Sequence, residues 1–383
     1  MPLVLPALVL VTIAALALLY LRGDLNPILC GGPCDAEFVT PPVGMVEPTP
    51  AVAKPIAEST DPIDARQVQA AIEASLKSAA LGSRVGFLAL DARDGKKLAQ
   101  TGSGALTPAS TTKVLTAFAA LSELGPAKRF ATTVKLQGDQ LVLVGGGDPY
   151  LTAKSVKAST VEKASLAQLA KLTAGKLGDS PVTLGYDVSL FTGPAVSKGW
   201  EPTYVSSQIV APVSPLWIDR GRVGLGRSID PAAAAATAFA AQLRAAGVNV
   251  TGEPVQAEAA ESAKVVAAVQ SAPVSNILDR MLVTSDNEVA EVMLRQAAIG
   301  AGKPGSFDSG VTTVKAALKS ADVSTAGLEL HDGSGLSRKN RIDPRTLAEA
   351  FEQAVNSADT ATLVSAVPVG GLNGTMKNRF YQA

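Results

Sequence analysis

Two short residue clusters have the residue types needed for nucleophilic catalysis, and the first is Ser110 with Lys113. Both lie in TPASTTKVLTAFAAL (107–121). Residues three apart lie on one face of a helix, where a lysine amine can accept a serine proton once burial lowers the lysine pKa. The helix dipole would also favour negative charge that develops near the serine. About one Ser-x-x-Lys sequence is expected by chance in a chain this long, so the pair alone is more typical of a polar helix start.

The second cluster is Ser285-Asp286-Asn287, which lies between two segments with helical spacing of apolar residues. Ser, Asp and Asn are also the favoured helix N-caps, which is the non-catalytic interpretation of each residue. The patterns Ser-x-x-Lys and Ser-x-Asn each occur once in the chain. Together they match two of the three motifs of active-site serine penicillin-recognising enzymes, so their combination is more informative than either alone.

A third candidate is the tract LHDGSGLSR (330–338), which contains the only histidine of the chain, His331. By itself the tract predicts a Gly/Ser-rich turn. A Ser-His-Asp hydrolase with His331 as the base is the competing enzyme hypothesis. The chain contains no Gly-x-Ser-x-Gly nucleophile elbow, which weakens that hypothesis.

The surrounding pattern predicts the elements that must position these residues. One helix is expected over 107–124, with Thr107 as its N-cap and Pro108 at its first position. Two more capped helices are expected to begin at Asp230-Pro231 and Asp343-Pro344. Helical spacing of apolar residues is also found over 68–81, 274–283 and 287–299. Short strands are predicted on either side of a turn within 84–101, and over 131–137, 141–147 and 180–186.

The string DGSGLSR (332–338), followed by NRI and a proline, resembles a signature of the class C low-molecular-mass penicillin-binding proteins. These are D-alanyl-D-alanine carboxypeptidases and DD-endopeptidases of the bacterial cell wall. The resemblance extends from about residue 66 to the end of the chain. Other segments that agree with the family, in the same order, are TPASTTKVLTAFAAL (107–121), GGGDPYL (145–151), TSDNEVAEVML (284–294) and GGLNGTMKNRF (370–380).

This resemblance implies an α/β (α+β) fold with a β-lactamase/transpeptidase-like catalytic domain. Residues 63–130 plus 273–383 would form the serine DD-peptidase domain, and residues 131–272 a large mixed insertion between the first two motifs. The implied reaction is hydrolysis of peptidoglycan stem peptides through an acyl-enzyme. β-Lactams would act as inhibitors that mimic the substrate, and no metal or organic cofactor is implied.

The resemblance also assigns roles at the matching positions. Ser110 would be the acylated nucleophile and Lys113 its general base. Ser285 would relay a proton to the departing D-alanine, and Asn287 would hydrogen-bond the substrate peptide.

Three further positions receive less specific roles from the resemblance. Asp332 and Ser334 would take part in substrate binding, in a tract that shapes the site rather than doing chemistry. Asp148, in the GGGDPYL segment, would be structural.

The third motif of the family, Lys-Thr-Gly, does not occur in the 383 residues, and Lys377 does not replace it. That strand would pair with the substrate and donate an oxyanion-hole N–H, and loss of one such donor costs about 10²–10³ in rate. We therefore expect these residues to be part of a longer active enzyme. By themselves they are expected to fold poorly, with an unpaired edge on the 84–101 hairpin, and not to turn over substrate. The alternative is a catalytically dead, membrane-tethered cell-wall-binding protein that keeps the peptidase fold.

The N-terminal 62 residues predict attachment rather than catalysis. Residues 3–21 carry no charge and are long enough to cross a hydrocarbon layer of ~30 Å. Residues 1–22 are therefore predicted to be a transmembrane anchor, with a cleaved signal peptide as the alternative. Residues 23–62 form a Pro-rich linker, so the catalytic part would lie outside the cytoplasm, at the membrane or secreted. Cys30 and Cys34 could form a disulfide there, or be two unpaired thiols without a role. A lipid-attachment cysteine is a weaker alternative, since Leu29 stands where a small residue is usual.

Composition excludes other function classes. The chain has 34 Lys+Arg and 34 Asp+Glu, and only 4% of its residues are aromatic. A nucleic-acid-binding protein needs a basic face and stacking rings, so no nucleic-acid partner is expected. One histidine and two cysteines cannot form a three-ligand zinc site without carboxylates.

Overall fold

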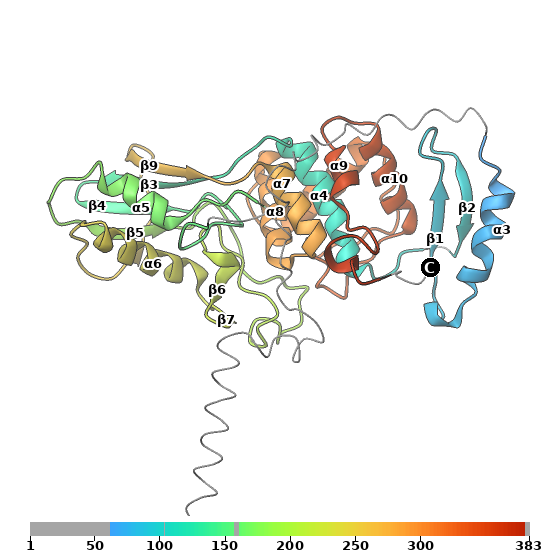
Figure 1. Cartoon of the computed structure of the whole chain (residues 1–383), viewed down its shortest axis with the longest axis horizontal. Helices are drawn as coiled ribbons and strands as arrows, with labels where there is room; N and C mark the ends of the chain where they lie inside the picture. The colour runs from blue at the N-terminus through green and yellow to red at the C-terminus, as the bar shows by residue number, and fades with distance from the viewer. Residues whose placement is uncertain (1–61, 103, 157–160, 380–383) are drawn as a thin grey trace, which may run out of the picture. The chain divides into compact units, whose positions relative to one another are not determined.

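The computed structural model describes residues 62–102, 104–156 and 161–379 (Figure 1). The predicted anchor (1–22), nearly all of the linker (23–62) and the Cys30–Cys34 pair lie outside the described residues. Within the described part, none of the helices is both long and apolar enough to cross a membrane.

Helix α4 (Thr112–Leu124) forms the centre of a helical layer. Its residues from Thr112 to Leu121 are all buried, which requires neighbours on every side. The helices that contact α4 are α7 (Val274–Thr284), α8 (Asn287–Gly300), α9 (Phe307–Ser320), α10 (Pro344–Val355) and α11 (Thr362–Ala366). Their apolar side chains form a first hydrophobic cluster around α4, which fixes the helix that carries Lys113.

The predicted strand–turn–strand of residues 84–101 is confirmed. Strands β1 (Phe87–Leu90) and β2 (Lys97–Thr101) pair antiparallel, and among the described residues their sheet has two strands. Helix α3 (Ala65–Leu76) packs on β2, and α10 packs on β1. All four residues of β1 are only half-buried.

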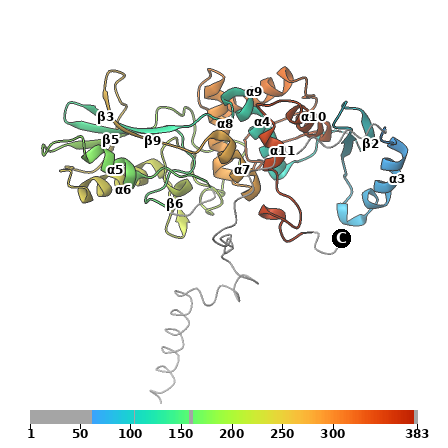
Figure 2. The same cartoon turned by 45° about the horizontal axis from the view of Figure 1, so that its top comes forward.

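A five-stranded mixed sheet forms a second layer, in the order β8-β5-β4-β3-β9. Its strands are β3 (Ala131–Gln137), β4 (Gln140–Val144), β5 (Thr183–Asp187), β8 (Val255–Gln256) and β9 (Lys264–Gln270). Strand β3 is antiparallel to β4 and β9, whereas β5 is parallel to β4 and β8. Helices α5 (Leu166–Ala174) and α6 (Pro231–Ala245) pack against each other and the sheet (Figures 1 and 2), and a second hydrophobic cluster fills the space between.

A small hairpin follows the sheet strand β5 in the chain. It consists of the 3-10 turn η3 (Asp219–Gly221) and the short strands β6 (Arg222–Val223) and β7 (Gly226–Arg227). The other 3-10 turns are η1 (Ala79–Leu81), η2 (Ala109–Thr111) and η4 (Gly374–Met376).

The predicted N-cap at Thr107 is wrong. Ala109 has a positive φ of 49°, which interrupts helical geometry, and Ala109–Thr111 form the turn η2 before α4 begins at Thr112. No side chain caps η2. The hydroxyl of Thr107 instead accepts a hydrogen bond of 3.1 Å from Nη1 of Arg341.

Helix α9 was not expected from the sequence. Its first half, Phe307–Val314, contains Gly310 and several β-branched residues, which are weak helix formers. A Cβ at Gly310 would lie 2.5 Å from Cγ of Leu294, so the glycine permits close packing of α9 on α8. Tertiary packing therefore outweighs local propensity in this segment.

Candidate active site

The ammonium group of Lys113 lies at the centre of a buried polar cluster. Its Nζ donates hydrogen bonds to Oγ of Ser110 (3.1 Å), Oδ1 of Asn287 (2.8 Å) and the backbone carbonyl of Ser334 (2.8 Å). These three acceptors come from η2, from the start of α8 and from the 330–338 loop. Lys113 is only 1% exposed, whereas Ser110 is exposed. The structure therefore places the accessible hydroxyl of Ser110 within hydrogen-bond distance of the buried amine of Lys113.

Burial lowers the pKa of Lys113 to about 8. The carboxylates of Glu291, Asp286, Asp332 and Glu288 act in the opposite direction and stabilise the charged form. An amine with a pKa near neutrality can lose its proton at little cost, which is what a general base for a serine hydroxyl requires.

Backbone contacts hold Ser110 in place beside this amine. Leu106 and Ile342 exchange two backbone hydrogen bonds (3.0 and 2.9 Å), which join the segment before Ser110 to the segment that follows the 330–338 loop. The hydroxyl of Thr112 donates to the carbonyl of Ala109 (2.9 Å). Ser110 is thus presented from a constrained turn rather than from regular helix.

The turn between α7 and α8 carries the second predicted cluster. Ser285 ends α7 in the left-handed conformation (φ 54°), and its hydroxyl has no hydrogen bond within the described part of the chain. Asp286 caps α8 by accepting a hydrogen bond from the N–H of Val289 (3.2 Å). Asn287 is the member of this cluster that touches Lys113 directly.

Glu291 is a site residue that the sequence analysis missed. It is fully buried on α8, one turn after Asn287, and its two carboxylate oxygens accept the backbone N–H groups of Gly333 (2.8 Å) and Ser334 (2.9 Å). The hydroxyl of Thr116 donates to the carbonyl of Gly333 (2.7 Å) from the α4 side. Both helices therefore hold the loop whose carbonyl faces Lys113. The i, i+4 spacing of Asn287 and Glu291 was the available sequence signal.

Burial and, to a smaller extent, the negative charge of Asp332 raise the pKa of Glu291 to about 8. The hydrogen bonds from Ser334 and from the N–H of Gly333 act in the opposite direction. Glu291 is linked to Lys113 through Ser334, whose N–H binds the carboxylate and whose carbonyl accepts the hydrogen bond from Lys113.

Asp332 and Ser334, the two predicted substrate-binding residues, lie in this loop, and hydrogen bonds within the protein occupy both side chains. Both residues are 0% exposed. The Asp332 carboxylate accepts hydrogen bonds from Trp200 Nε1 (2.9 Å), Asn340 Nδ2 (2.7 Å) and two backbone N–H groups. The Ser334 hydroxyl accepts the N–H of Leu336 (3.2 Å). Their hydrogen-bonding capacity is used to shape the loop.

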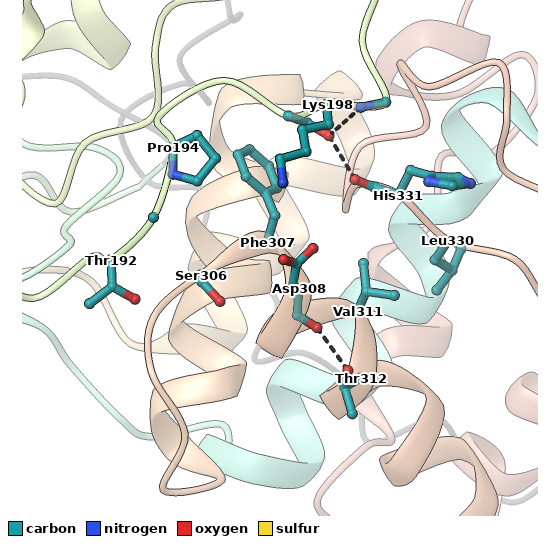
Figure 3. Close-up of a pocket in the computed structure, with 13 residues that line it drawn as sticks. Thr192, Pro194, Lys198, Ser306, Phe307, Asp308, Val311, Thr312, Leu330 and His331 are labelled. Atoms are coloured by element: carbon teal, nitrogen blue, oxygen red, sulfur yellow. Dashed lines mark hydrogen bonds between the residues drawn. The ribbon is translucent and has the colours of Figure 1, made fainter.

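His331 lies outside the polar cluster. It is exposed and lines a cavity of about 570 Å³ together with Lys198 and Asp308, a cavity that neither Ser110 nor Lys113 lines (Figure 3). Among the described residues its hydrogen bonds involve only its backbone groups, with Ser197 (2.8 Å) and Asn340 (2.8 Å) as partners. Ser110 therefore has Lys113, and not His331, as its hydrogen-bonded base.

Two other sequence features are also placed by the structure. Lys377 follows η4, is exposed, and has no side-chain bond to the cluster among the described residues. Over the described ranges, no group of three or more His, Cys, Asp or Glu side chains could hold a metal ion.

Comparisons with known proteins identify relatives of this chain. The model of the D-Ala-D-Ala carboxypeptidase 3 (S13) family matches residues 68–226 and 224–383. Carboxypeptidase DacB of Mycolicibacterium smegmatis is 34% identical, and the match covers 97% of this chain and 82% of that protein. A carboxypeptidase of Mycobacterium tuberculosis is also 34% identical, over 86% of this chain and 73% of its own length.

Solved structures show a similar fold. Penicillin-binding protein 4 of Haemophilus influenzae aligns with a TM-score of 0.67 at 23% identity, over 83% of this chain and 84% of that chain. The same protein in complex with a β-lactam gives a TM-score of 0.60 at 24% identity. The mixed α/β arrangement described above is therefore similar to that of penicillin-binding protein 4.

Proposed function

This chain belongs to the D-Ala-D-Ala carboxypeptidase 3 (S13) family, and we propose that it hydrolyses the D-Ala-D-Ala bond of peptidoglycan stem peptides through an acyl-enzyme on Ser110. Family membership makes it a D-Ala-D-Ala carboxypeptidase of the low-molecular-mass penicillin-binding class. The observation that carries the serine mechanism is the hydrogen bond between Oγ of Ser110 and the buried Nζ of Lys113. A scaffold without activity is not favoured.

The chemistry follows from the placement of the two groups. Neutral Lys113 takes the proton of Ser110 as its Oγ attacks the carbonyl carbon of the penultimate D-alanine. Collapse of the tetrahedral intermediate breaks the peptide C–N bond, and the terminal D-alanine leaves after its amine gains a proton. Water then attacks the ester, which regenerates Ser110 and releases the shortened stem peptide.

Ser285 and Asn287 complete the set of proposed roles. The hydroxyl of Ser285 has no intramolecular hydrogen bond in the described part of the chain and is partly exposed, so it is available to pass the proton to the leaving amine. Oδ1 of Asn287 is used by Lys113, which leaves its Nδ2 to donate to a carbonyl of the substrate peptide. We assign Asp332 and Ser334 to shaping the loop rather than to contacting substrate.

We also propose that β-lactams inhibit the enzyme and that the chain is attached to the membrane. A β-lactam would acylate Ser110 as a substrate mimic, in line with the β-lactam complex of the Haemophilus influenzae protein. Endopeptidase action on cross-linked peptides would use the same attack on a D-alanyl carbonyl. The uncharged segment 3–21 supports attachment to the membrane, with the catalytic part outside the cytoplasm.

Labelling with fluorescent penicillin tests the proposed nucleophile. We expect the full-length gene product to be labelled and Ser110→Ala to show no labelling and no release of D-alanine from a stem pentapeptide. Ser122→Ala is the matched control, because Ser122 is an exposed serine on α4, the helix that follows the turn carrying Ser110. His331→Ala should also be labelled normally. Equal labelling of wild type and Ser110→Ala would show that Ser110 is not the nucleophile.

A further inference from the structure

Two arginines of the η3–β6–β7 segment form ion pairs with the two residues that flank Asn287. We name residues Asp219–Arg227 the arginine hairpin. Nη1 of Arg220 pairs with Oδ2 of Asp286, and Nε of Arg227 pairs with Oε1 of Glu288. The hairpin is distant in sequence, since 66 positions separate Arg220 from Asp286. The two carboxylates that flank Asn287, the hydrogen-bond partner of Lys113, are thus held from outside the helical layer.

The burial of these groups makes the pairing important for the turn. The side chains of Asp286 and Glu288 are only 2% and 5% exposed. A buried carboxylate without a partner is strongly unfavourable, whereas one that is paired and hydrogen-bonded is tolerated. Asp286 also caps α8, so its orientation sets where the first turn of that helix begins. Release of either arginine would therefore disturb the α7–α8 turn.

Both segments joined by these ion pairs contain residues in the left-handed conformation. Ser285 has a φ of 54°, and Asp219 and Arg220 have φ values of 50° and 61°. Such non-glycine conformations are unfavourable and persist only where the surroundings fix them. The hairpin is fixed in turn by its backbone, because the N–H of Asp219 donates to the carbonyl of Leu151 (2.8 Å).

A further contact ties Arg227 to the chain before the hairpin. Its Nη1 donates to the carbonyl of Gln208, and its backbone N–H donates to Oε1 of the same residue. The Arg227 side chain is only 15% exposed. Arg222, on the neighbouring strand of the same hairpin, is exposed and forms no ion pair within the described part of the chain.

We infer that Arg220 and Arg227 are positioning residues for the acylation reaction. From the arginine hairpin they hold the α7–α8 turn, so that Asn287 stays against Lys113 and Ser285 keeps its place in that turn. This inference rests on the proposed function of Ser110. Neither arginine touches the reacting atoms in this view. Each acts through a carboxylate of the α7–α8 turn, so the sheet-containing part of the chain would contribute directly to the geometry of the site.

The test measures acylation by fluorescent penicillin in Arg220→Ala, Arg227→Ala, Arg227→Lys and the control Arg222→Ala. Binding and the acylation step are separated by following the rate against penicillin concentration. We expect Arg220→Ala and Arg227→Ala to lower the maximal acylation rate by about 10- to 100-fold, the size of effect that a small misplacement of catalytic groups produces. Arg222→Ala should acylate at the wild-type rate, and Arg227→Lys should recover part of the loss because it keeps a cation opposite Glu288.

The outcomes separate this inference from the proposed function. Labelling of Ser110→Ala would overturn the proposed function whatever the arginines do. If Ser110→Ala is not labelled while Arg220→Ala and Arg227→Ala are acylated as fast as wild type, the inference about the arginines is wrong and the proposed function stands. A loss of melting temperature with an unchanged maximal acylation rate would also overturn it, because that is the signature of a purely structural role. Arg220, 35% exposed, provides a variant with less risk of misfolding than Arg227.

Discussion

At the scale of single residues, Lys113 decides when the site can react. Burial lowers its pKa to about 8, and a base acts only in its unprotonated form. The acylation rate is therefore expected to rise with pH through about 8 and to level off above that value. Lys113→Arg should acylate about 10²–10⁴-fold more slowly at every pH, because arginine cannot be deprotonated in this range.

The measurement is the rate of fluorescent-penicillin acylation from pH 6 to pH 10. Lys128→Arg is the matched control, because Lys128 is exposed and its side chain lies outside the cluster. A wild-type rate that does not change over this range, or Lys113→Arg with the wild-type rate, would show that Lys113 is not the base.

Asp148 links burial to the stability of the fold. Its Oδ1 accepts the N–H of Tyr150 (2.9 Å), and its buried Oδ2 has no partner among the described residues. Burial raises the pKa of Asp148 from 3.8 to about 7. The folded state then holds one more proton than the unfolded state between these pH values, so folding stability falls as the pH rises from about 4 to about 7.

Asp148→Asn should remove this pH dependence, because an amide keeps the Oδ1 acceptor and has no charge. Relative to wild type, we expect the variant to gain about 2–4 kcal/mol of stability between pH 4.5 and pH 8, because only the wild type has to bury a charged carboxylate over this range. Urea unfolding at pH 4.5 and pH 8 gives the comparison. A difference between the two proteins that is the same at both pH values would contradict the prediction.

At the scale of elements, the sequence predicted helix starts that depend on local capping, but not the helix that depends on tertiary packing. The predicted starts at Asp230-Pro231 and Asp343-Pro344 are confirmed, since both aspartates accept N–H groups at the first turns of α6 and α10. Thr107 failed as a cap because the positive φ of Ala109 interrupts the helix, and nothing in an alanine predicts that conformation. Helix α9 was missed because its stability comes from contact with α8.

The same division applies to the site. Ser110, Lys113 and Asn287 could be proposed because their side chains carry the chemistry. The acceptor that Ser334 offers to Lys113 is its backbone carbonyl, and a carbonyl is present in every residue. Arg220 was not foreseeable either, because its ion pair joins segments 66 residues apart and its spacing follows no motif.

Gly335 tests how closely the 330–338 loop must approach the turn that carries Ser110. Gly335 has a φ of 86°, and a Cβ at this position would lie 1.8 Å from the carbonyl oxygen of Ala109. Gly335→Ala must therefore push the loop away from the turn that carries Ser110. We expect a lower melting temperature and an acylation rate reduced by at least about tenfold.

Gly302→Ala is the matched control for this substitution. Gly302 has a comparable φ of 71°, but nothing lies within 4 Å of the added Cβ. Its cost should be only the conformational one, about 1–2 kcal/mol, without an effect on acylation. Equal acylation rates in the two alanine variants would mean that contact between Gly335 and Ala109 does not position Ser110.

At the scale of the whole described unit, α8 connects two hydrophobic clusters that share no residue. Its buried polar side chains bind the 330–338 loop on one side and the segment after β4 on the other. Glu291 binds the 330–338 loop, whereas Nε2 of Gln296 donates to the carbonyls of Gly146 (2.8 Å) and Gly147 (3.3 Å), next to strand β4. Hydrogen bonds and ion pairs to α8 therefore join the active site to the sheet-containing part of the chain, beside buried apolar residues of that part, such as Trp200 and Trp217, that belong to the first cluster.

This arrangement predicts what happens when the sheet cluster is weakened. Phe239 is fully buried on α6, and Phe239→Ala should cost about 3–5 kcal/mol within that cluster. Because the two clusters share no side chains, we expect calorimetry of this variant to show a separate unfolding transition at lower temperature. Penicillin labelling should be lost in that first transition, since the arginine hairpin then releases Asp286 and Glu288 while α4 and α8 are still folded.

The control is Phe118→Ala in the first cluster, which should show no such early transition. Labelling of Phe239→Ala that persists until the helical layer unfolds would mean that the site does not depend on the sheet-containing part of the chain.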